Sequence, residues 1–309
     1  MTGAVAGGPG RLRFGYGTNG MADHRLDDAL GLLADLGYDG VALTLDHMHL
    51  DPYAGDLAAR VGAVAHRLDR LGLAVVIETG ARYVLDARRK HRPTLLDEPG
   101  REHRLDLLRR AISIGADLGA EAVSFWAGVL PSTVEADAGW SRLVAGCAEL
   151  ADLAGQRAVR LAFEPEPGML VETIAGYQRL AGQVGGAERL GLTLDIGHCR
   201  CLEPAPEADC VRRAGAWLAN VQIEDMRRGV HEHLPFGEGE VDLPAVLAAL
   251  GEVGYAGLVS VELPRHSHAA AALAEQSLRA LRAAAAAAHP AGPAAGAGAG
   301  KTESEVPVR

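Results

Sequence analysis

The sequence predicts a single (β/α)8 TIM barrel, a fold in which eight parallel strands alternate with helices. Two observations favour it: eight short apolar runs alternate with longer segments of helical periodicity, and glycines recur where a helix would end. With 309 residues the chain has room for one large domain or two small ones. We assign residues 11–286 to the barrel and expect disordered tails at 1–10 and 287–309, where Gly, Ala and Pro are frequent and no periodicity is seen.

The expected strands are short runs rich in Val, Leu, Ala and Ile, and each later strand follows a segment with apolar residues at helical spacing. In the first such segment these residues are Leu26, Leu30 and Leu33. The eight runs span 12–16, 40–45, 74–78, 122–126, 160–164, 192–195, 220–224 and 258–262.

Glycines mark the joints between helix and strand. Gly37, Gly72, Gly119 and Gly254 each stand shortly before an expected strand, and glycine tolerates the left-handed conformation that closes a helix. Asp242, followed by Leu-Pro, supplies a helix start. An open doubly wound sheet is the alternative, but the glycines at 15–20 are not followed by the helix that a dinucleotide-binding turn requires.

Composition excludes several classes of protein. The formal net charge of −10, with lysine only at Lys90 and Lys301, disfavours a nucleic-acid partner, because phosphate neutralisation needs clustered positive charge. No run approaches the roughly 20 apolar residues of a membrane span, and no signal-peptide pattern opens the chain, so we expect a cytoplasmic protein. Four cysteines are too few for a disulfide framework.

Acidic residues close several late strands. In a barrel, active-site side chains lie at the C-terminal strand ends, so Glu164, Asp195 and Glu262 should face one mouth. Three crowded carboxylates repel one another unless a cation lies between them. Gln222 on the seventh strand can add a carbonyl oxygen, and an oxygen-rich shell suits Mg²⁺, Mn²⁺ or Co²⁺ better than Zn²⁺. Each acid taken alone could equally be a helix cap or a solvated loop charge.

From about residue 11 to 285 the chain resembles the xylose isomerase-like TIM-barrel family, and four motifs carry the resemblance. They are Phe163-Glu164-Pro165, Leu194-Asp195-x-x-His198, Phe236-Gly237-Glu238-Gly239-Glu240-Val241-Asp242 and Tyr255-x-Gly257-x-x-Ser260-x-Glu262. The resemblance implies a metal held by Glu164, Asp195, the strand-seven residue and Glu262. It also implies a sugar or cyclitol isomerase or epimerase that removes a proton next to a carbonyl through an enediolate. Its partner would be a small polyhydroxylated carbonyl substrate, and barrels of this family often associate into homo-oligomers.

The sequence departs from the family at strand seven. Most isomerases of the family carry histidine in a His-x-x-Asp pattern, whereas this chain has Gln222-Ile-Glu-Asp225. Glutamine there is similar to some dehydratases, so an inosose or dehydroshikimate dehydratase-like lyase is the second hypothesis and a non-catalytic sugar-binding barrel the third. The endonuclease branch is disfavoured, because it needs histidines where this chain has Glu78 and Trp126.

Three residues are candidates for catalysis. Glu166, two residues past Glu164, is the first candidate for the general base, although a loop carboxylate steadied by its flanking prolines is an equal alternative. His198 resembles the family histidine that faces the substrate oxygen. Glu262 is assigned to catalysis as well as to the metal.

Four further residues are candidates for substrate binding. Trp126 would form an apolar wall against a sugar face, and Arg227 could bind a phosphate or hydroxyl group. His231 and His233 could bind the substrate, or His233 a second metal, but an exposed histidine pair is the alternative. The basic run at 82–92 could form a lid over an anionic substrate or a solvated loop.

Overall fold

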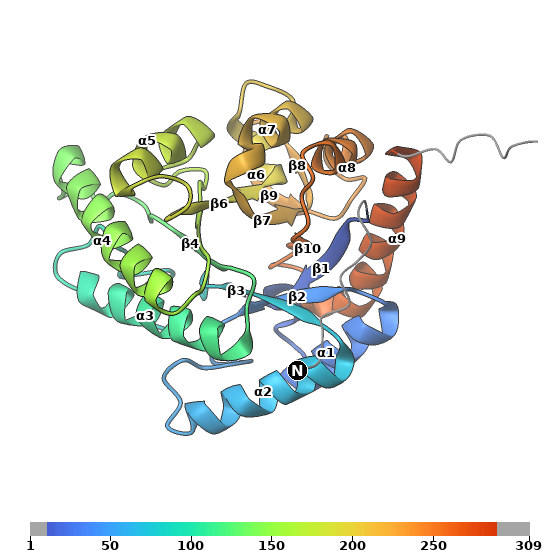
Figure 1. The fold of residues 1–309 in the computed structure, drawn as a ribbon, viewed down its shortest axis with the longest axis horizontal. Coiled ribbons are helices and arrows are strands. Elements are labelled where there is room, and N and C mark those ends of the chain that lie inside the picture. Colours follow the sequence, from blue (N-terminus) through green and yellow to red (C-terminus); the bar gives the residue numbers. More distant parts are fainter. Residues whose placement is uncertain (1–10, 289–309) are drawn as a thin grey trace, which may run out of the picture.

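The computed structural model describes residues 11–288, and within that range eight parallel strands close into a barrel (Figure 1). Around the ring the order is β1-β10-β7-β6-β5-β4-β3-β2. Every expected strand overlaps one of them, so the predicted fold is confirmed. The bounds are β1 Arg13–Gly17, β2 Gly40–Thr44, β3 Ala74–Glu78, β4 Val123–Trp126, β5 Leu161–Glu164, β6 Gly191–Asp195, β7 Leu218–Ile223 and β10 Leu258–Val261.

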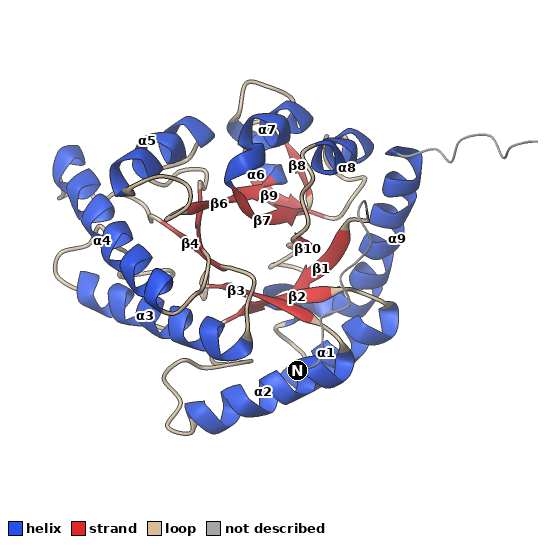
Figure 2. Ribbon diagram, in the orientation of Figure 1, coloured by secondary structure: helices blue, strands red, loops and turns tan. Residues whose placement is uncertain are grey.

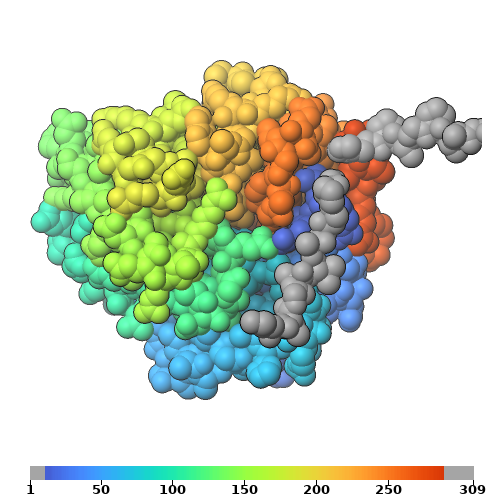
Figure 3. Space-filling view, viewed as in Figure 1, coloured from blue at the N-terminus to red at the C-terminus, as the bar shows by residue number. Residues whose placement is uncertain are grey.

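The α-helices surround the barrel and cover its outer face (Figure 2). In the space-filling view they follow one another around the ring in chain order (Figure 3). No helix within residues 11–288 is long and apolar enough to cross a membrane. The bounds are α1 Leu26–Leu36, α2 Leu57–Leu71, α3 Arg101–Leu118, α4 Ala136–Gln156, α5 Ile174–Val184, α6 Ile196–Leu202, α7 Glu207–Ala214, α8 Leu243–Glu252 and α9 Ala270–Ala288.

The predicted helix ends are present. Gly37, Gly72 and Gly119 cap α1, α2 and α3 with φ of 91°, 65° and 65°, a conformation that costs other residues about 1 kcal/mol or more. Asp242 caps α8 by accepting a hydrogen bond from the Ala245 N–H at 3.1 Å. Local sequence therefore sets where these helices begin and end.

The structure adds one element that the periodicity does not predict. After β7 the chain forms an antiparallel hairpin of β8 (Asp225–Arg227) and β9 (Val230–Leu234), which sequence patterns treat as a loop. At the C-terminal end α9 continues to Ala288, two residues past the predicted boundary. The rest of the two predicted tails, 1–10 and 289–309, lies outside the described residues.

Small and hydroxyl-bearing side chains lie below the acidic strand ends on the inward face of the barrel. Residues two apart on a strand share a face, so Ala162 lies below Glu164 and Thr193 below Asp195. Thr193 hydrogen-bonds Ser124 at 2.8 Å across the interior. Small side chains and satisfied hydroxyls thus close the floor beneath the carboxylates.

Candidate metal and catalytic site

The three predicted carboxylates converge at one end of the barrel. Glu164, Asp195 and His198 offer ligand atoms that all lie within 4.8 Å of one another. Asp195, His233 and Glu262 form a second set within the same distance. Asp195, the last residue of β6, belongs to both sets, so it lies near Glu164 of β5 and also near Glu262, which follows β10.

The Asp-x-x-His spacing folds as a helix cap that turns His198 into the site. Asp195 ends β6 and caps α6, and its Oδ1 accepts a hydrogen bond from the His198 backbone N–H at 2.7 Å. The His198 Nδ1 lies 3.1 Å from the Pro165 carbonyl oxygen and 3.7 Å from Glu164 Oε1. A nitrogen that faces a carbonyl carries the proton, which leaves Nε2 as the acceptor or ligand nitrogen.

The hairpin carries two further histidines to the same place. His231 and His233 are two apart on β9 and so share a face, and both line the pocket beside His198. The His198 and His231 Nε2 atoms lie 3.1 Å apart. His233 is buried, with 8% of its surface exposed, and His231 is partly buried. The alternative of an exposed histidine pair is therefore wrong, because the β8–β9 turn folds these side chains inward.

Asp225 holds the hairpin in place. Its buried carboxylate accepts three backbone hydrogen bonds, from the N–H groups of Met226 (3.0 Å), Gly237 (2.8 Å) and Val241 (2.9 Å). These bonds tie β8 to the segment that follows β9. The position of His233 thus depends on a residue that does not itself contact the site.

The buried carboxylates of the site repel one another, and a bound cation would relieve this repulsion. Burial raises the pKa of Glu164 well above its usual range, and the neighbouring Glu262 and Glu166 raise it further. Burial likewise raises the pKa of Glu262. Among the described residues no hydrogen-bond partner reaches Asp195 Oδ2 or Gln222 Oε1, while His233 Nδ1 lies 3.5 Å from Glu224 Oε1. Buried oxygen atoms without partners, set among mutually repelling carboxylates, fit a divalent cation.

Two amides orient Glu262. The Asn19 Nδ2 donates to Glu262 Oε1 at 2.8 Å, and the Gln222 Nε2 donates to Oε2. Gln222 therefore contacts the predicted ligand set through its nitrogen, and its Oε1 is the atom left for a cation. Sequence reasoning missed Asn19, although it stands two residues past the first strand, at the barrel end where active sites form.

Glu166 lines the same pocket and has the titration range of a general base. Burial raises its pKa to about 7; His233 opposes this shift, and Asp195 adds to it. A turn fixes the loop that bears it, since the Glu166 N–H donates to the Val171 carbonyl at 3.1 Å. The predicted base is thus held beside the carboxylates.

The pocket has an empty volume of about 860 Å³ including its open mouth. Trp126 lines it, with the His91 ring 5.3 Å away and the Arg104 guanidinium 4.7 Å from the Trp126 ring centre. Glu78 lines it too and accepts a hydrogen bond from Thr44 at 2.8 Å. The sequence analysis used Glu78 only to disfavour the endonuclease branch and gave it no role in the site, although it is the last residue of β3. Residues not proposed as site residues also line the pocket: Thr18, Asp46, Met48, His49, Arg82, Lys90, His91 and Arg265.

Arg227 does not reach the pocket. It is exposed, and its Nη2 donates to the Glu238 carbonyl at 2.8 Å. The expectation that it binds substrate is not supported, because the chain leaves the barrel at Asp225 and Arg227 already lies in the hairpin.

Comparisons with known proteins agree with this fold. The L-ribulose-5-phosphate 3-epimerase UlaE of Salmonella paratyphi C is 27% identical over 241 residues, 76% of this chain and 81% of that one. An uncharacterized protein of Methanocaldococcus jannaschii is 26% identical over 182 residues, 55% of this chain and 60% of that one.

Solved structures show the same architecture. An L-ribulose 3-epimerase structure has a TM-score of 0.73 at 22% identity and covers 90% of this chain and 96% of its own. The IOLI protein, solved with a binding zinc atom, has a TM-score of 0.71 at 18% identity and covers 91% of this chain and 100% of its own. The family model of the xylose isomerase-like TIM barrel matches residues 30–284, and the chain therefore belongs to that family.

Proposed function

We propose that the protein is a divalent-metal-dependent isomerase or epimerase of a small polyhydroxylated carbonyl compound, a sugar or a cyclitol. The observation that carries the proposal is that Glu164, Asp195 and Glu262 belong to overlapping candidate ligand sets, and that Glu164 and Glu262 line one pocket together with Glu166. The epimerase relative named above supports the same reaction class. A dehydratase remains the second hypothesis because of Gln222.

The residues that would hold the cation are Glu164, Asp195 and Glu262, with His233 or Gln222 Oε1 completing the set. The carboxylates suit Mn²⁺, Mg²⁺ or Co²⁺, and the nearby imidazoles also admit Zn²⁺. A divalent cation bound there would stabilise negative charge that develops on the substrate oxygen.

The protein's own groups would move the proton. With a pKa of about 7, Glu166 is close to half ionised at neutral pH, so it can both remove a proton next to a carbonyl and return it. Glu262 is held by hydrogen bonds from two side-chain amides. It enters the site from a different part of the barrel than Glu166, because β10 and β5, which precede them, are three places apart in the ring of strands. Epimerisation needs groups on both faces of the reacting carbon, and we assign these two roles to Glu166 and Glu262.

Three pocket residues would orient the substrate. His198 is held through Nδ1, and its Nε2 lies 3.1 Å from His231 Nε2, so the two imidazoles together would contact a substrate hydroxyl. His231 lies beside it as a second polar contact. Trp126 offers an apolar wall for one face of the sugar.

The reaction class is tested by NMR in deuterium oxide with a panel of ketoses, aldoses and inososes and added Mn²⁺, Mg²⁺ or Co²⁺. We expect deuterium to enter at the carbon next to the carbonyl while the carbon skeleton keeps all its oxygens. A product lighter by one water would instead establish the dehydratase. A protein that retains no divalent ion and exchanges no substrate hydrogen would be the non-catalytic barrel.

The role of Glu166 is tested with a matched pair of variants in the same loop. We expect Glu166→Gln to lower kcat by about 10²-fold or more, the usual contribution of a general base. Glu172→Gln removes an exposed carboxylate outside the pocket and should leave kcat unchanged. Wild-type turnover by Glu166→Gln, with metal content unaltered, would exclude it as the base.

A further inference from the structure

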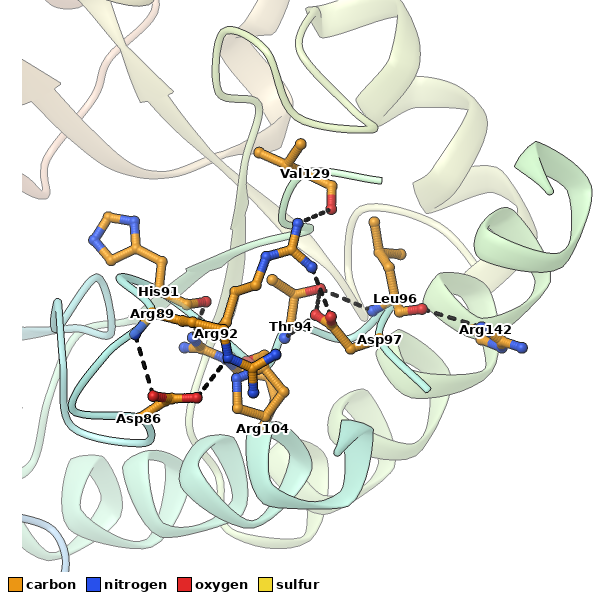
Figure 4. A network of polar contacts seen from close by, with 11 residues as sticks. Asp86, Arg89, His91, Arg92, Thr94, Leu96, Asp97, Arg104, Val129 and Arg142 are labelled. Atoms are coloured by element: carbon orange, nitrogen blue, oxygen red, sulfur yellow. Dashed lines mark hydrogen bonds and ion pairs between the residues drawn. The ribbon is translucent and has the colours of Figure 1, made fainter. Parts of the chain in front are cut away.

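The basic run at 82–92 is divided by the structure into paired and unpaired cations. Arg89 pairs with Asp86 (Nε to Oδ2, 2.6 Å), and Arg92 pairs with Asp97 (Nη1 to Oδ1, 2.6 Å), as Figure 4 shows. These two arginines are neutralised within their own segment. The run as a whole therefore does not act as one charged surface.

Two other cations of this loop, unlike Arg89 and Arg92, form no ion pair with a described carboxylate. Arg82 and Lys90 line the pocket, and so does Arg265, which follows β10. Within residues 11–288, no carboxylate oxygen lies within 4.0 Å of the side-chain nitrogens of these three residues. Arg82 donates to the Pro264 carbonyl, so the loops after β3 and β10 meet here. Burial lowers the pKa of Lys90, and the like charges of Arg82 and Arg265 lower it further, whereas Glu166 opposes the shift.

Hydrogen bonds to backbone carbonyls hold the segment that follows Lys90 in place. The buried Arg104 donates to the carbonyls of His91 (2.8 Å) and Pro93 (2.9 Å), as in Figure 4. His91 has a φ of 62°, a left-handed conformation that costs a non-glycine residue about 1 kcal/mol or more. Its N–H donates to the Arg82 carbonyl at 2.6 Å. A buried arginine thus stabilises a strained backbone that places Lys90 beside the pocket.

The pocket lining therefore carries charges of both signs: the carboxylates of Glu78, Glu164, Glu166 and Glu262, and the three cations Arg82, Lys90 and Arg265. A neutral sugar would leave these three cations without a direct ion-pair partner, although Glu166 lies near enough to Lys90 to affect its pKa. A phosphate monoester carries about −1.5 to −2 charges at pH 7 and three acceptor oxygens, whereas a carboxylate carries one charge and two oxygens. Three convergent cations match the phosphate better.

We propose that Arg82, Lys90 and Arg265 bind the phosphate group of a phosphorylated polyhydroxy carbonyl substrate, whose carbonyl end reaches Glu166 and the carboxylates. This inference rests on the proposed function and names its substrate class. Lys90 and Arg265 then determine specificity without taking part in proton transfer.

The test compares each sugar of a ketose panel with its terminal phosphate ester. For the esters, we expect Lys90→Gln and Arg265→Gln to raise KM by about 10- to 100-fold, the effect of losing one charged hydrogen bond, while kcat stays within about threefold. For the free sugars the rise in KM should be much smaller, because no phosphate group contacts these cations. Lys90→Arg should restore most of the affinity. Arg88→Gln, an exposed arginine of the same loop outside the pocket, is the matched control and should behave as wild type.

Several outcomes would overturn the inference. If ester and free sugar have equal kcat/KM and Lys90→Gln affects neither, the phosphate site is wrong while the epimerase stands. If only sugar acids respond to Lys90→Gln, the cations bind a carboxylate and the phosphate assignment fails.

A binding measurement separates the inference from the proposed function when no sugar is turned over. A ³¹P NMR titration of the full chain with inorganic phosphate should then show binding that Lys90→Gln weakens and Arg88→Gln preserves. That result would support the anion site although the epimerase had failed. Absence of this difference would reject the site.

Discussion

Replacement of Asp225 should show how the hairpin is held against the barrel. Its carboxylate accepts three backbone N–H groups, with Oδ1 serving Met226 and Val241 and Oδ2 serving Gly237. Asp225→Ala removes all three acceptors. Asp225→Asn keeps Oδ1 but presents an NH₂ group to the Gly237 N–H.

The expected loss in the free energy of unfolding depends on how many of these three hydrogen bonds each variant removes. A hydrogen bond to a charged group contributes about 1.5 kcal/mol or more, and an unsatisfied buried donor costs about 1–3 kcal/mol. Because Asp225 is buried, we expect Asp225→Asn to cost about 1–3 kcal/mol. We expect Asp225→Ala to cost about 3–5 kcal/mol, since water will reach some of the freed donors.

Urea unfolding, followed by circular dichroism, measures the free energy of unfolding for both variants. Asp209→Ala, at an exposed carboxylate on α7, is the control and should change stability by less than about 1 kcal/mol. Calorimetric titration with Mn²⁺ should show weaker binding by Asp225→Ala, because His233 loses its fixed position. Equal and small losses for Asn and Ala would refute the claim that these three hydrogen bonds anchor the hairpin.

Three further predictions concern packing, protonation and metal binding. Gly40→Ala should cost about 1–3 kcal/mol, because its Cβ would lie 2.6 Å from the Ala74 carbonyl oxygen, whereas Gly62→Ala, with nothing within 4 Å, should gain about 0.5–1 kcal/mol in urea unfolding. Burial, followed by the charges of Lys90 and Arg104, lowers the pKa of His91 from 6.5 to about 4; the unfolded chain is therefore protonated first, and stability should fall as pH drops from 6.5 to 4. His91→Gln should flatten this slope by up to about 1 kcal/mol per pH unit, and an unchanged slope would contradict the assignment. Divalent metal at 100 times its Kd should stabilise the protein by about 2.7 kcal/mol in thermal unfolding, an effect that Asp195→Asn should abolish.

Much of the fold could be predicted because its signals are local. Gly37, Gly72 and Gly119 close helices through their own backbone conformation, and Asp242 caps α8 through a contact three residues away. The sequence pattern also locates the ends of β5 and β6, and it therefore predicts that Glu164 and Asp195 lie close together. A parallel barrel sends every strand end to the same mouth, and this rule converts a one-dimensional pattern into proximity.

The rest of the site depends on contacts between residues distant in the sequence. Asn19 meets Glu262 across 243 residues, and no periodicity links the two. The hairpin brings His233 inward and carries Arg227 outward, although both lie in the same stretch of sequence. A motif gives the order of residues, but not the direction in which a loop turns.

The sequence by itself determined the barrel, its helix ends and the three acidic strand ends, because backbone propensity and strand direction act over a few residues. Only the tertiary structure decided which cations of the basic run face the pocket, which histidines join the carboxylates and which amides orient Glu262. Those choices depend on burial and on pairing between separate loops. Arg89 is neutralised by Asp86 three residues before it, whereas Lys90, the next residue, lines the pocket.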